Sequence, residues 1–557
     1  MKLCKSLLLV LFAIISNVNF SQQDTLRYWV QFTDKNNSIF DVNNPLDFLS
    51  QKAIDRRGKR NISITDQDFP VNQNYIDSIL SKPIVWMHNQ SRWFNAVTIS
   101  CGDTISLQAI QNLPFVQQIE KVKSFYKPME DHKLESIAVD KSFESYSVNA
   151  HYPYGKTYEQ LHLHRIEYLH ELGFKGQEMV IAVIDAGFLN VDKMEGLSHL
   201  FENGNVLSTK DFVAHDGDVY QDHYHGAAVL SIIASDIPGV YQGSAIKAKF
   251  HLLRSEDADA EYRMEEDNWI SAAEYADSAG ADLINTSLGY TTFDDSLQNH
   301  SYADLDGQTT RIAIGSNIAF SKGMLLCSSA GNSGSNSWGY ISTPADADSI
   351  MTIGAVDSNG RYAPFSSFGP ASDGGLKPNV MSVGWNTYFE SPYNSEIAQG
   401  NGTSFSSPMF TGMAACLWQA LPDLSHTELK NLIESHSSRS NAPDTLFGYG
   451  VPDFYQAYKS QNGLTFTYGS KLKLLELYPN PLMETGDLTL MLLSPEDQDI
   501  QIELFNTIGQ KVESFSIAIL EGRNKVSLNY RDWVAGGYVI VLTDSSGEKV
   551  SSKVTVY

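Results

Sequence analysis

The spacing of apolar and polar positions changes twice along the chain and so divides it into three regions. In the first region, apolar and polar residues alternate in short runs, which predicts strands at residues 28–32, 94–99 and 116–122. Two further runs have helical spacing and predict helices at residues 45–56 and 105–113. This mixture is typical of a small α+β domain, which we place at residues 22–126.

The second region alternates short apolar strands with longer helical segments, which is the pattern of a parallel α/β sheet. The predicted strands lie at residues 179–184, 249–253, 282–286, 324–328 and 349–356, and the predicted helices at 225–235, 265–279, 310–322 and 404–421. We therefore expect an α/β fold, a doubly wound and mainly parallel sheet, over residues 154–460. In such sheets ligands bind at the carboxyl ends of strands, so polar residues there are functional candidates.

The third region, residues 476–557, has the alternation of an all-β sandwich. Its clearest strand patterns lie at residues 500–505, 537–542 and 549–557, with turns at Gly509 and at residues 545–547 between them. Polar stretches at residues 127–153 and 461–475 are interpreted as linkers. The first linker is the expected place for proteolytic cleavage, because exposed polar segments are cut most readily.

The first 21 residues have the layout of a secretory signal peptide. Lys2 and Lys5 precede the apolar run 7–15, and a polar stretch follows it to residue 21. The apolar run is too short to span a membrane, and no later run reaches about 18 apolar residues. We therefore expect export and no transmembrane span.

Composition narrows the possible partners. The 65 acidic residues exceed the 40 Lys and Arg residues and give a formal charge of -25, which argues against nucleic acid or anionic lipid as a main partner. Four cysteines are too few for a disulfide scaffold. Cys327 and Cys416 lie in apolar segments, so we expect them to be buried thiols and not a bridge.

Two segments of the α/β region end or begin on a titratable residue. Asp185 ends the apolar run 180–184, where a buried carboxylate can orient an imidazole or simply cap the next element. His225 opens an apolar helix and is either a proton carrier or a buried structural histidine. The pair His223 and His225 suggests a metal only weakly, because no third ligand follows at zinc-protease spacing.

Two more segments carry a polar residue just after a strand or at the start of a helix. Asn332 follows the strand 324–328 between glycines, where its amide can donate to an oxyanion or serve as an ordinary turn residue. Ser404 follows Gly400 and Gly402 at a helix start, where a serine is either an N-cap or a nucleophile near the positive end of the helix dipole.

Together these residues resemble the subtilisin-like serine proteases, the subtilase family, over about residues 154–460. Asp, His, Asn and Ser occur in that order within one α/β unit, and the segment 285–289 (Asn-Thr-Ser-Leu-Gly) adds to the likeness. The resemblance implies a secreted serine endopeptidase that acts on proteins or peptides. It implies a catalytic triad of Asp185, His225 and Ser404, an oxyanion hole at Asn332, and substrate binding by Ser287, Leu288, Gly289, Ser329, Ala330 and Gly331.

The sequence departs from the family pattern in two places. The family usually has Thr or Ser where Ala186 stands and Thr where Ala227 stands, so we expect altered local hydrogen bonding without loss of activity. Asp304 and Asp306 before Gly307 faintly resemble a calcium loop, but most of the ligand spacing is missing and a solvated loop is favoured. We expect no cofactor and assign no metal, and the sequence leaves a structural calcium ion open.

The resemblance also gives meaning to the flanking regions. Residues 22–126 resemble the propeptide of these proteases, which implies that the chain is made as a preproenzyme inhibited by its own propeptide. Within it, Arg56-Arg57 and Lys59-Arg60 are interpreted as a solvated helix face. Residues 476–557 resemble the sorting domain of type IX secretion substrates, which implies that machinery as a partner and a secreted or cell-surface location. A carbohydrate-binding module is the alternative for this tail.

Two other functions stay open at this point. A catalytically silent relative could keep the fold and bind peptides at the cell surface. An esterase could use the same triad. The presence of all four reacting residue types favours the enzyme, because a binding protein has no need of the complete set.

Overall fold

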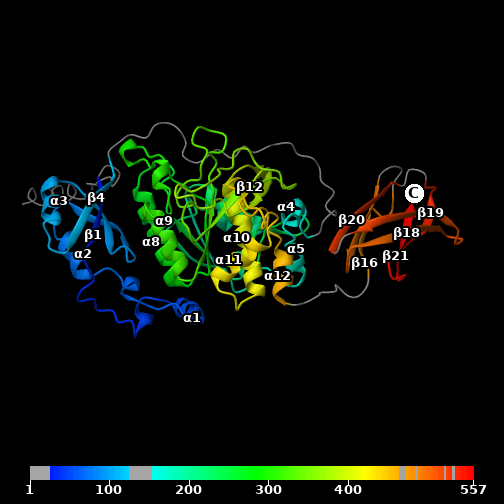
Figure 1. The fold of residues 1–557 in the computed structure, drawn as a ribbon, viewed down its shortest axis with the longest axis horizontal. Coiled ribbons are helices and arrows are strands. Elements are labelled where there is room, and N and C mark those ends of the chain that lie inside the picture. The colour runs from blue at the N-terminus through cyan, green and yellow to red at the C-terminus, as the bar shows by residue number, and fades with distance from the viewer. Residues whose placement is uncertain (1–25, 125–152, 463–471, 483–486, 520–521, 530–532) are drawn as a thin grey trace, which may run out of the picture. The chain divides into compact units, whose positions relative to one another are not determined.

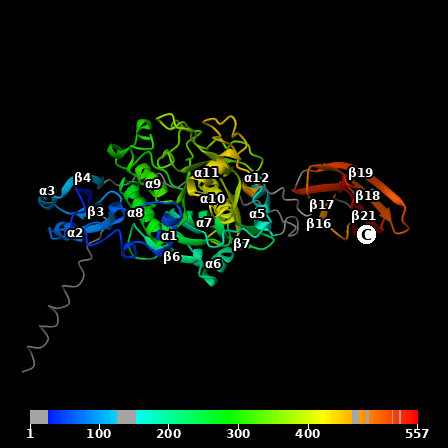
Figure 2. The ribbon, with the colours of Figure 1, turned by 60° about the horizontal axis from the view of Figure 1, so that its bottom comes forward.

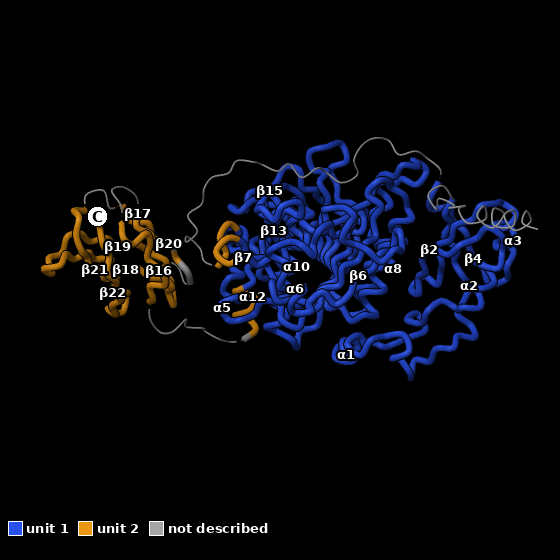
Figure 3. The backbone as a smooth tube through the Cα atoms, turned by 180° about the vertical axis from the view of Figure 1, so that it is seen from behind, with its two compact units in different colours: residues 1–142, 157–237, 241–454 blue, residues 143–156, 238–240, 455–557 orange. Residues whose placement is uncertain are grey.

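The computed structural model describes residues 26–124, 153–462, 472–482, 487–519, 522–529 and 533–557. The expected signal peptide, nearly all of the first linker and most of the second lie outside the described residues. The chain divides into two compact units, coloured separately in Figure 3. The first comprises residues 1–142, 157–237 and 241–454, and the second comprises residues 143–156, 238–240 and 455–557.

A seven-stranded sheet forms the centre of the first unit, in the order β13-β12-β11-β10-β5-β9-β6. All neighbouring strands in it are parallel. Its strands are β5 (Val180–Asp185), β6 (Val206–Asp211), β9 (Lys249–Arg254), β10 (Leu283–Thr286), β11 (Leu325–Ser329), β12 (Met351–Val356) and β13 (Val380–Val383). Strands β10 to β13 follow one another on one side of β5, and β9 and β6 lie on the other side, which confirms the predicted doubly wound α/β fold.

Helices cover both faces of this sheet, as Figures 1 and 2 show. Helices α8 (Met264–Ala279) and α9 (Arg311–Ser321) contact each other on one side, and α7 (His225–Ala234) and α10 (Thr403–Ala420) contact each other on the other. Because both faces are covered, β5 is buried along its whole length, and its sequence VIAVID is apolar up to the final Asp185. Trp269, Ile284 and Leu326 belong to the core between the sheet and α8 and α9.

The first unit contains further elements that the hydrophobic pattern did not predict. The edge strands β6 and β13 are among them, as is a hairpin of β14 (Thr387–Glu390) and β15 (Ile397–Gly400) that leads into α10. The remaining elements are α4 (Tyr158–His162), α5 (Glu167–Glu171), α6 (Ser198–Glu202), β7 (Asp236–Ile237), β8 (Tyr241–Gln242) and α11 (His426–Ser435). Helix α12 (Phe454–Asn462) follows, and all of it except Phe454 falls in the second unit.

The N-terminal domain has a four-stranded antiparallel sheet in the order β2-β3-β1-β4. Its elements are β1 (Arg27–Phe32), β2 (Val85–Ser91), β3 (Ala96–Cys101), β4 (Val116–Lys123), α1 (Gln51–Lys59), α2 (Gln73–Leu80) and α3 (Thr104–Gln111). This confirms the α+β prediction. The single helix predicted at residues 45–56 is wrong, because a 3-10 turn at Pro45–Asp47 is followed by a separate helix that Ser50 caps.

The tail of the second unit consists of two antiparallel sheets, β16-β17-β20 and β19-β18-β21-β22. The strands are β16 (Lys473–Tyr478), β17 (Asp487–Ser494), β18 (Gln498–Asn506), β19 (Lys511–Ile519), β20 (Gly522–Asn529), β21 (Gly536–Thr543) and β22 (Lys549–Val556). Residues of both sheets, such as Leu490, Ile502 and Ile540, share one buried core. The predicted all-β sandwich is thereby confirmed.

Cysteine and membrane predictions can be compared with the described residues. Cys101, Cys327 and Cys416 are all free thiols and buried, as expected for the latter two. Within the described ranges, none of the helices is both long enough and apolar enough to cross a bilayer.

Candidate active site

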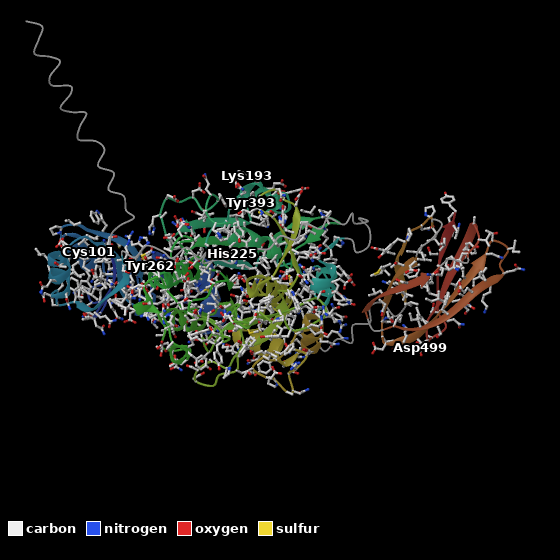
Figure 4. The ribbon with its side chains drawn as sticks, turned by 90° about the horizontal axis from the view of Figure 1, so that it is seen from above. Cys101, Lys193, His225, Tyr262, Tyr393 and Asp499 are labelled. Carbon is white, nitrogen blue, oxygen red and sulfur yellow. The ribbon has the colours of Figure 1, made fainter. Side chains whose placement is uncertain are left out.

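Asp185 and His225 meet where β5 ends and α7 begins. His225 Nδ1 lies 2.8 Å from Asp185 Oδ1, and the two side chains are 7% and 0% exposed. Glycine permits this approach, since a Cβ on Gly226 would lie 2.4 Å from the carbonyl oxygen of Gly187. A carboxylate that accepts from Nδ1–H fixes the tautomer of an imidazole and leaves Nε2 able to accept a proton. Figure 4 labels His225 within the body of the first unit.

Ser404 lies in the first turn of α10, the helix that packs against α7. Its hydroxyl donates to the carbonyl oxygen of Ser287 at 3.4 Å, while Ser287 Oγ donates to the carbonyl oxygen of Ser404 at 3.0 Å. The Ser404 hydroxyl thus pairs with the carbonyl oxygen of Ser287. Catalytic hydrogen bonds are often long or misaligned before substrate binds, and the serine rotamer decides which partner is reached.

Asn332 is held beside the start of α10 in a defined orientation. Its Oδ1 accepts from the backbone N–H of Thr403 at 2.8 Å and from Thr403 Oγ1 at 3.0 Å. A Cβ built on Gly402 would lie 3.6 Å from both Asn332 Nδ2 and the backbone nitrogen of Ser404. Asn332 Nδ2 and the backbone N–H of Ser404 therefore flank one point next to the Ser404 side chain. The backbone N–H is available as a donor because the first turn of a helix leaves its N–H groups without intrahelical acceptors. Donors arranged in this way can stabilise an oxyanion.

The two predicted substrate-binding segments lie after neighbouring strands. Ser287, Leu288 and Gly289 follow β10, while Ser329 ends β11 and is followed by Ala330 and Gly331. Ser342, which the sequence analysis did not identify, faces a glycine of each segment: a Cβ on Gly289 would lie 2.0 Å from Ser342 Oγ, and one on Gly331 would lie 3.2 Å away. The Ser342 side chain therefore limits the space next to both glycines.

The buried side-chain amide of Asn285 links the end of β10 to α10, the helix that carries Ser404. Asn285, which is 0% exposed, accepts hydrogen bonds from Ser407 Oγ and Thr411 Oγ1 of α10, both at 3.0 Å. Its Nδ2 donates to Ser287 Oγ at 3.3 Å. The sequence does hold a signal for this contact. Asn285 is an uncharged polar residue inside an apolar strand, and Ser407 and Thr411 place two hydroxyls four residues apart on one helix.

A second carboxyl group lies near Asp185 and His225. Asp222 packs against Gly187, and Arg254 Nη1 lies 2.9 Å from its Oδ1. Burial raises the pKa of Asp222 to about 6, against the opposing effect of the Arg254 charge. This carboxyl group therefore changes its charge close to neutral pH.

The described residues contain one group of three carboxylates whose oxygens all lie within 4.8 Å of one another: Glu256, Glu261 and Glu265. Carboxylate oxygens suit hard cations. However, backbone N–H groups donate to both oxygens of Glu265, so the cluster is engaged by the protein and we assign no metal to it. Asp304 and Asp306, the faint calcium-loop candidates, likewise accept hydrogen bonds from nearby backbone N–H groups.

Comparison with known families identifies three matched segments. Residues 176–450 match the subtilase family (Peptidase S8). Residues 27–136 match the Peptidase S8 propeptide domain of Bacteroidota. Residues 476–557 match the secretion system C-terminal sorting domain, which implies secretion or surface attachment.

Two Bacillus proteins support the match to the subtilase family. The subtilisin of Bacillus pumilus is 30% identical over 275 residues, which cover 48% of this chain and 86% of that protein. The thermophilic serine proteinase of Bacillus sp. (strain AK1) is 30% identical over 287 residues, which cover 51% of this chain and 62% of that protein. The crystal structure of MycP1 from Mycobacterium smegmatis is 21% identical, covers 59% of this chain and 90% of its own, and has a TM-score of 0.44. The chain belongs to the subtilase family, with a propeptide domain at its N-terminal side and a secretion sorting domain at its C-terminal end.

Proposed function

We propose that the protein is a secreted serine endopeptidase that cleaves peptide bonds through Asp185, His225 and Ser404. The observation that carries the proposal is the buried 2.8 Å contact between His225 Nδ1 and Asp185 Oδ1, beside the helix that starts at Thr403. Membership of a family of serine proteases supports the same reading.

The proposed reaction has two stages. The Ser404 hydroxyl attacks the scissile carbonyl carbon while His225 Nε2 takes its proton, and Asp185 holds the imidazolium that forms. Asn332 Nδ2 and the backbone N–H of Ser404 donate to the oxyanion of the tetrahedral intermediate. The C–N bond then breaks as His225 returns the proton to the leaving amine, and water hydrolyses the acyl-enzyme by the same steps.

The substrate is proposed to lie between the two segments that follow β10 and β11. Ser287, Leu288 and Gly289 would pair with an extended peptide, and Ser329, Ala330 and Gly331 would line the pocket for the residue before the cleaved bond. Pairing through the main chain gives affinity with little demand on sequence. Side-chain preference then depends on the space that Ser342 leaves beside the two glycines.

We further propose the domain boundaries and the processing route. The chain would carry a signal peptide at residues 1–21, a propeptide at 22–126, a linker with the maturation site at 127–153, the catalytic domain at 154–460, a linker at 461–475 and the sorting domain at 476–557. The propeptide would inhibit the enzyme until it is cut, and the type IX machinery would carry the chain across the outer membrane. Contacts of β2 with α8 support docking of the propeptide on the catalytic region: Asn89 Nδ2 donates to Asn268 Oδ1 at 2.7 Å, and Ser91 Oγ to Glu274 Oε1 at 2.6 Å.

Hydrolysis of denatured casein tests the proposal. Matured wild-type enzyme should release peptides whose N-termini define its side-chain preference, and a Ser404→Ala chain cut at the same linker should release none. Peptide binding by correctly processed wild type without cleavage would favour the silent relative. Turnover of an ester without cleavage of unfolded protein would favour an esterase.

A further inference from the structure

The two arginines interpreted from the sequence as a solvated helix face are buried. Arg56 is 5% exposed and Arg57 is 1% exposed, although both lie in the last turn of α1. The solvated-face prediction is therefore wrong for this pair, because α1 docks against the α/β region. Figures 1 and 2 show α1 away from α2 and α3 of its own domain and close to the catalytic helices.

Arg56 occupies the meeting point of two helix ends. Its guanidinium donates to the carbonyl oxygens of Asp277 at 3.1 Å and Lys322 at 3.2 Å, and to that of Ala281. Asp277 lies in the last turn of α8, and Lys322 is the C-terminal cap of α9. The last carbonyls of a helix lack intrahelical donors and carry partial negative charge, so a planar cation with several N–H groups fits between two such ends.

Carboxylates complete the binding site around the second arginine. Arg57 Nη2 donates to Asp277 Oδ2 at 2.7 Å and to Asp68 Oδ1 at 3.0 Å, and Arg56 Nη2 also pairs with Asp277 Oδ1. Lys322 Nζ lies 3.0 Å from Asp68 Oδ1. The side chains of Asp277 and Asp68 are 0% exposed. The propeptide thus supplies Arg56, Arg57 and Asp68, while the catalytic region supplies Asp277 and Lys322.

This cluster lies at the amino ends of the sheet strands, whereas Asp185 and Ser287 lie at the carboxyl ends of β5 and β10. Ala281 immediately precedes β10, whereas Ser287 follows its carboxyl end. Helix α1 also contacts the catalytic region at its N-terminal end, where Lys52 Nζ lies 2.7 Å from Asp282 Oδ2. Docking of α1 at the amino end of β10 therefore does not involve the carboxyl end of this strand, where Ser287 contacts Ser404.

We propose that α1 is a second anchor of the propeptide, which binds through Arg56 and Arg57 to a guanidinium site at the ends of α8 and α9. The anchor retains the severed propeptide on the enzyme after the linker is cut, which extends the proposed maturation. The site left on the mature enzyme fits a helix that presents two consecutive arginines. Removing Arg57 while the propeptide stays docked would leave Asp277 and Asp68 buried with fewer cations around them, which is far more costly than losing an exposed ion pair.

Dissociation of the cut propeptide tests the anchor without relying on catalysis. A full-length Ser404→Ala chain with a site-specific protease sequence inserted near residue 140 is immobilised by its C-terminus and cut, and release of the N-terminal fragment is timed. We expect Arg57→Met to accelerate release by about 100-fold or more, from the cost of breaking a buried ion pair. Arg57→Lys keeps the charge but not the forked geometry, and should accelerate release by about 10-fold.

Lys59→Met is the matched control on the same helix, because Lys59 is 48% exposed and its partner Asp423 is 98% exposed. It should change the release rate by less than about fivefold. Should Arg57→Met fail to fold, Arg57→Lys decides the outcome. Release of the Arg57→Lys fragment at the wild-type rate, or an effect of Lys59→Met as large as that of Arg57→Met, would overturn the anchor. Because Ser404→Ala is used throughout, an inactive wild-type enzyme would leave these results unaffected.

Discussion

Thr403 offers a way to test how Asn332 is held for oxyanion binding. Its hydroxyl donates to Asn332 Oδ1 at 3.0 Å and accepts from the backbone N–H of Gly331 at 3.1 Å. Replacement by valine keeps the shape of this buried side chain but removes both hydrogen bonds. The backbone N–H of Thr403 still donates to Asn332 Oδ1 at 2.8 Å, so the amide should loosen without leaving the site.

The expected loss follows from the energy of one neutral hydrogen bond. Such a bond contributes about 1 kcal/mol, which corresponds to about a fivefold change in rate. Thr403→Val should therefore lower kcat about fivefold and leave KM nearly unchanged, because the oxyanion forms only in the transition state. Asn332→Ala removes the donor itself and should lower kcat by about 100-fold to 1,000-fold, a range measured for the equivalent loss in a subtilisin.

The assay is initial-rate kinetics on a chromogenic peptide anilide, with active enzyme counted by fluorophosphonate titration. Thr403→Ser retains the hydroxyl and should behave like wild type. In the Asn332→Ala background, Thr403→Val should lower kcat by no more than about twofold, because the amide that Thr403 orients is no longer present. A fivefold loss that persists in that background would refute the reasoning, since Thr403 would then act independently of Asn332.

Three further predictions concern pH, specificity and stability. His88 of the propeptide stacks edge-on against His215 with ring centroids 4.7 Å apart, and burial together with the charges of Arg27, His215 and Lys123 lowers its pKa well below the usual range. The neutral form of His88 is thus favoured while the propeptide is docked. Docking is therefore strongest above the pKa of a free histidine, about 6.5, and weakens as pH falls below it. Titration of His88 alone can weaken docking by at most about tenfold per pH unit. In the cut Ser404→Ala chain, release should accelerate between pH 7 and pH 5, and His88→Gln should flatten that profile; an unchanged slope would assign the effect to other groups. Ser342→Gly should shift the preference for the residue before the cleaved bond toward larger side chains by about 10-fold in relative kcat/KM, measured on a peptide series, and an identical profile would exclude Ser342 from the pocket. Asn285→Leu leaves the buried Ser407 hydroxyl without its acceptor, while Thr411 Oγ1 keeps the carbonyl oxygen of Ser407 at 2.8 Å. The free energy of unfolding should therefore fall by about 1–3 kcal/mol in urea titration, and a wild-type midpoint would mean that this network contributes no stability.

The central strands and the four candidate residues could be predicted from the sequence for a simple physical reason. A parallel strand covered on both faces, such as β5, is mostly apolar, and its first polar residue marks the strand end. Asp185 was found in this way. Ser404 was found because glycines before an apolar helix mark a helix start.

Other features depend on contacts that no local pattern contains. The edge strand β6 has the sequence VLSTKD and is only partly buried, so it lacks the apolar signal of the central strands. Arg56 and Arg57 look like a charged surface because their carboxylate partner Asp277 is 221 and 220 residues away in the sequence. Thr403 was overlooked because an ordinary helix-start residue gives no sign of the amide it orients.

The most direct test of the proposed catalytic triad is peptide mapping after reaction with a fluorophosphonate, which bonds covalently to an activated serine hydroxyl. Matured wild-type enzyme should carry one adduct, on Ser404 Oγ, and His225→Ala should lower the labelling rate by at least about 1,000-fold. An adduct on a different serine, equal labelling of His225→Ala, or no labelling of correctly processed wild type would contradict the assignment of Asp185, His225 and Ser404 as one reacting group.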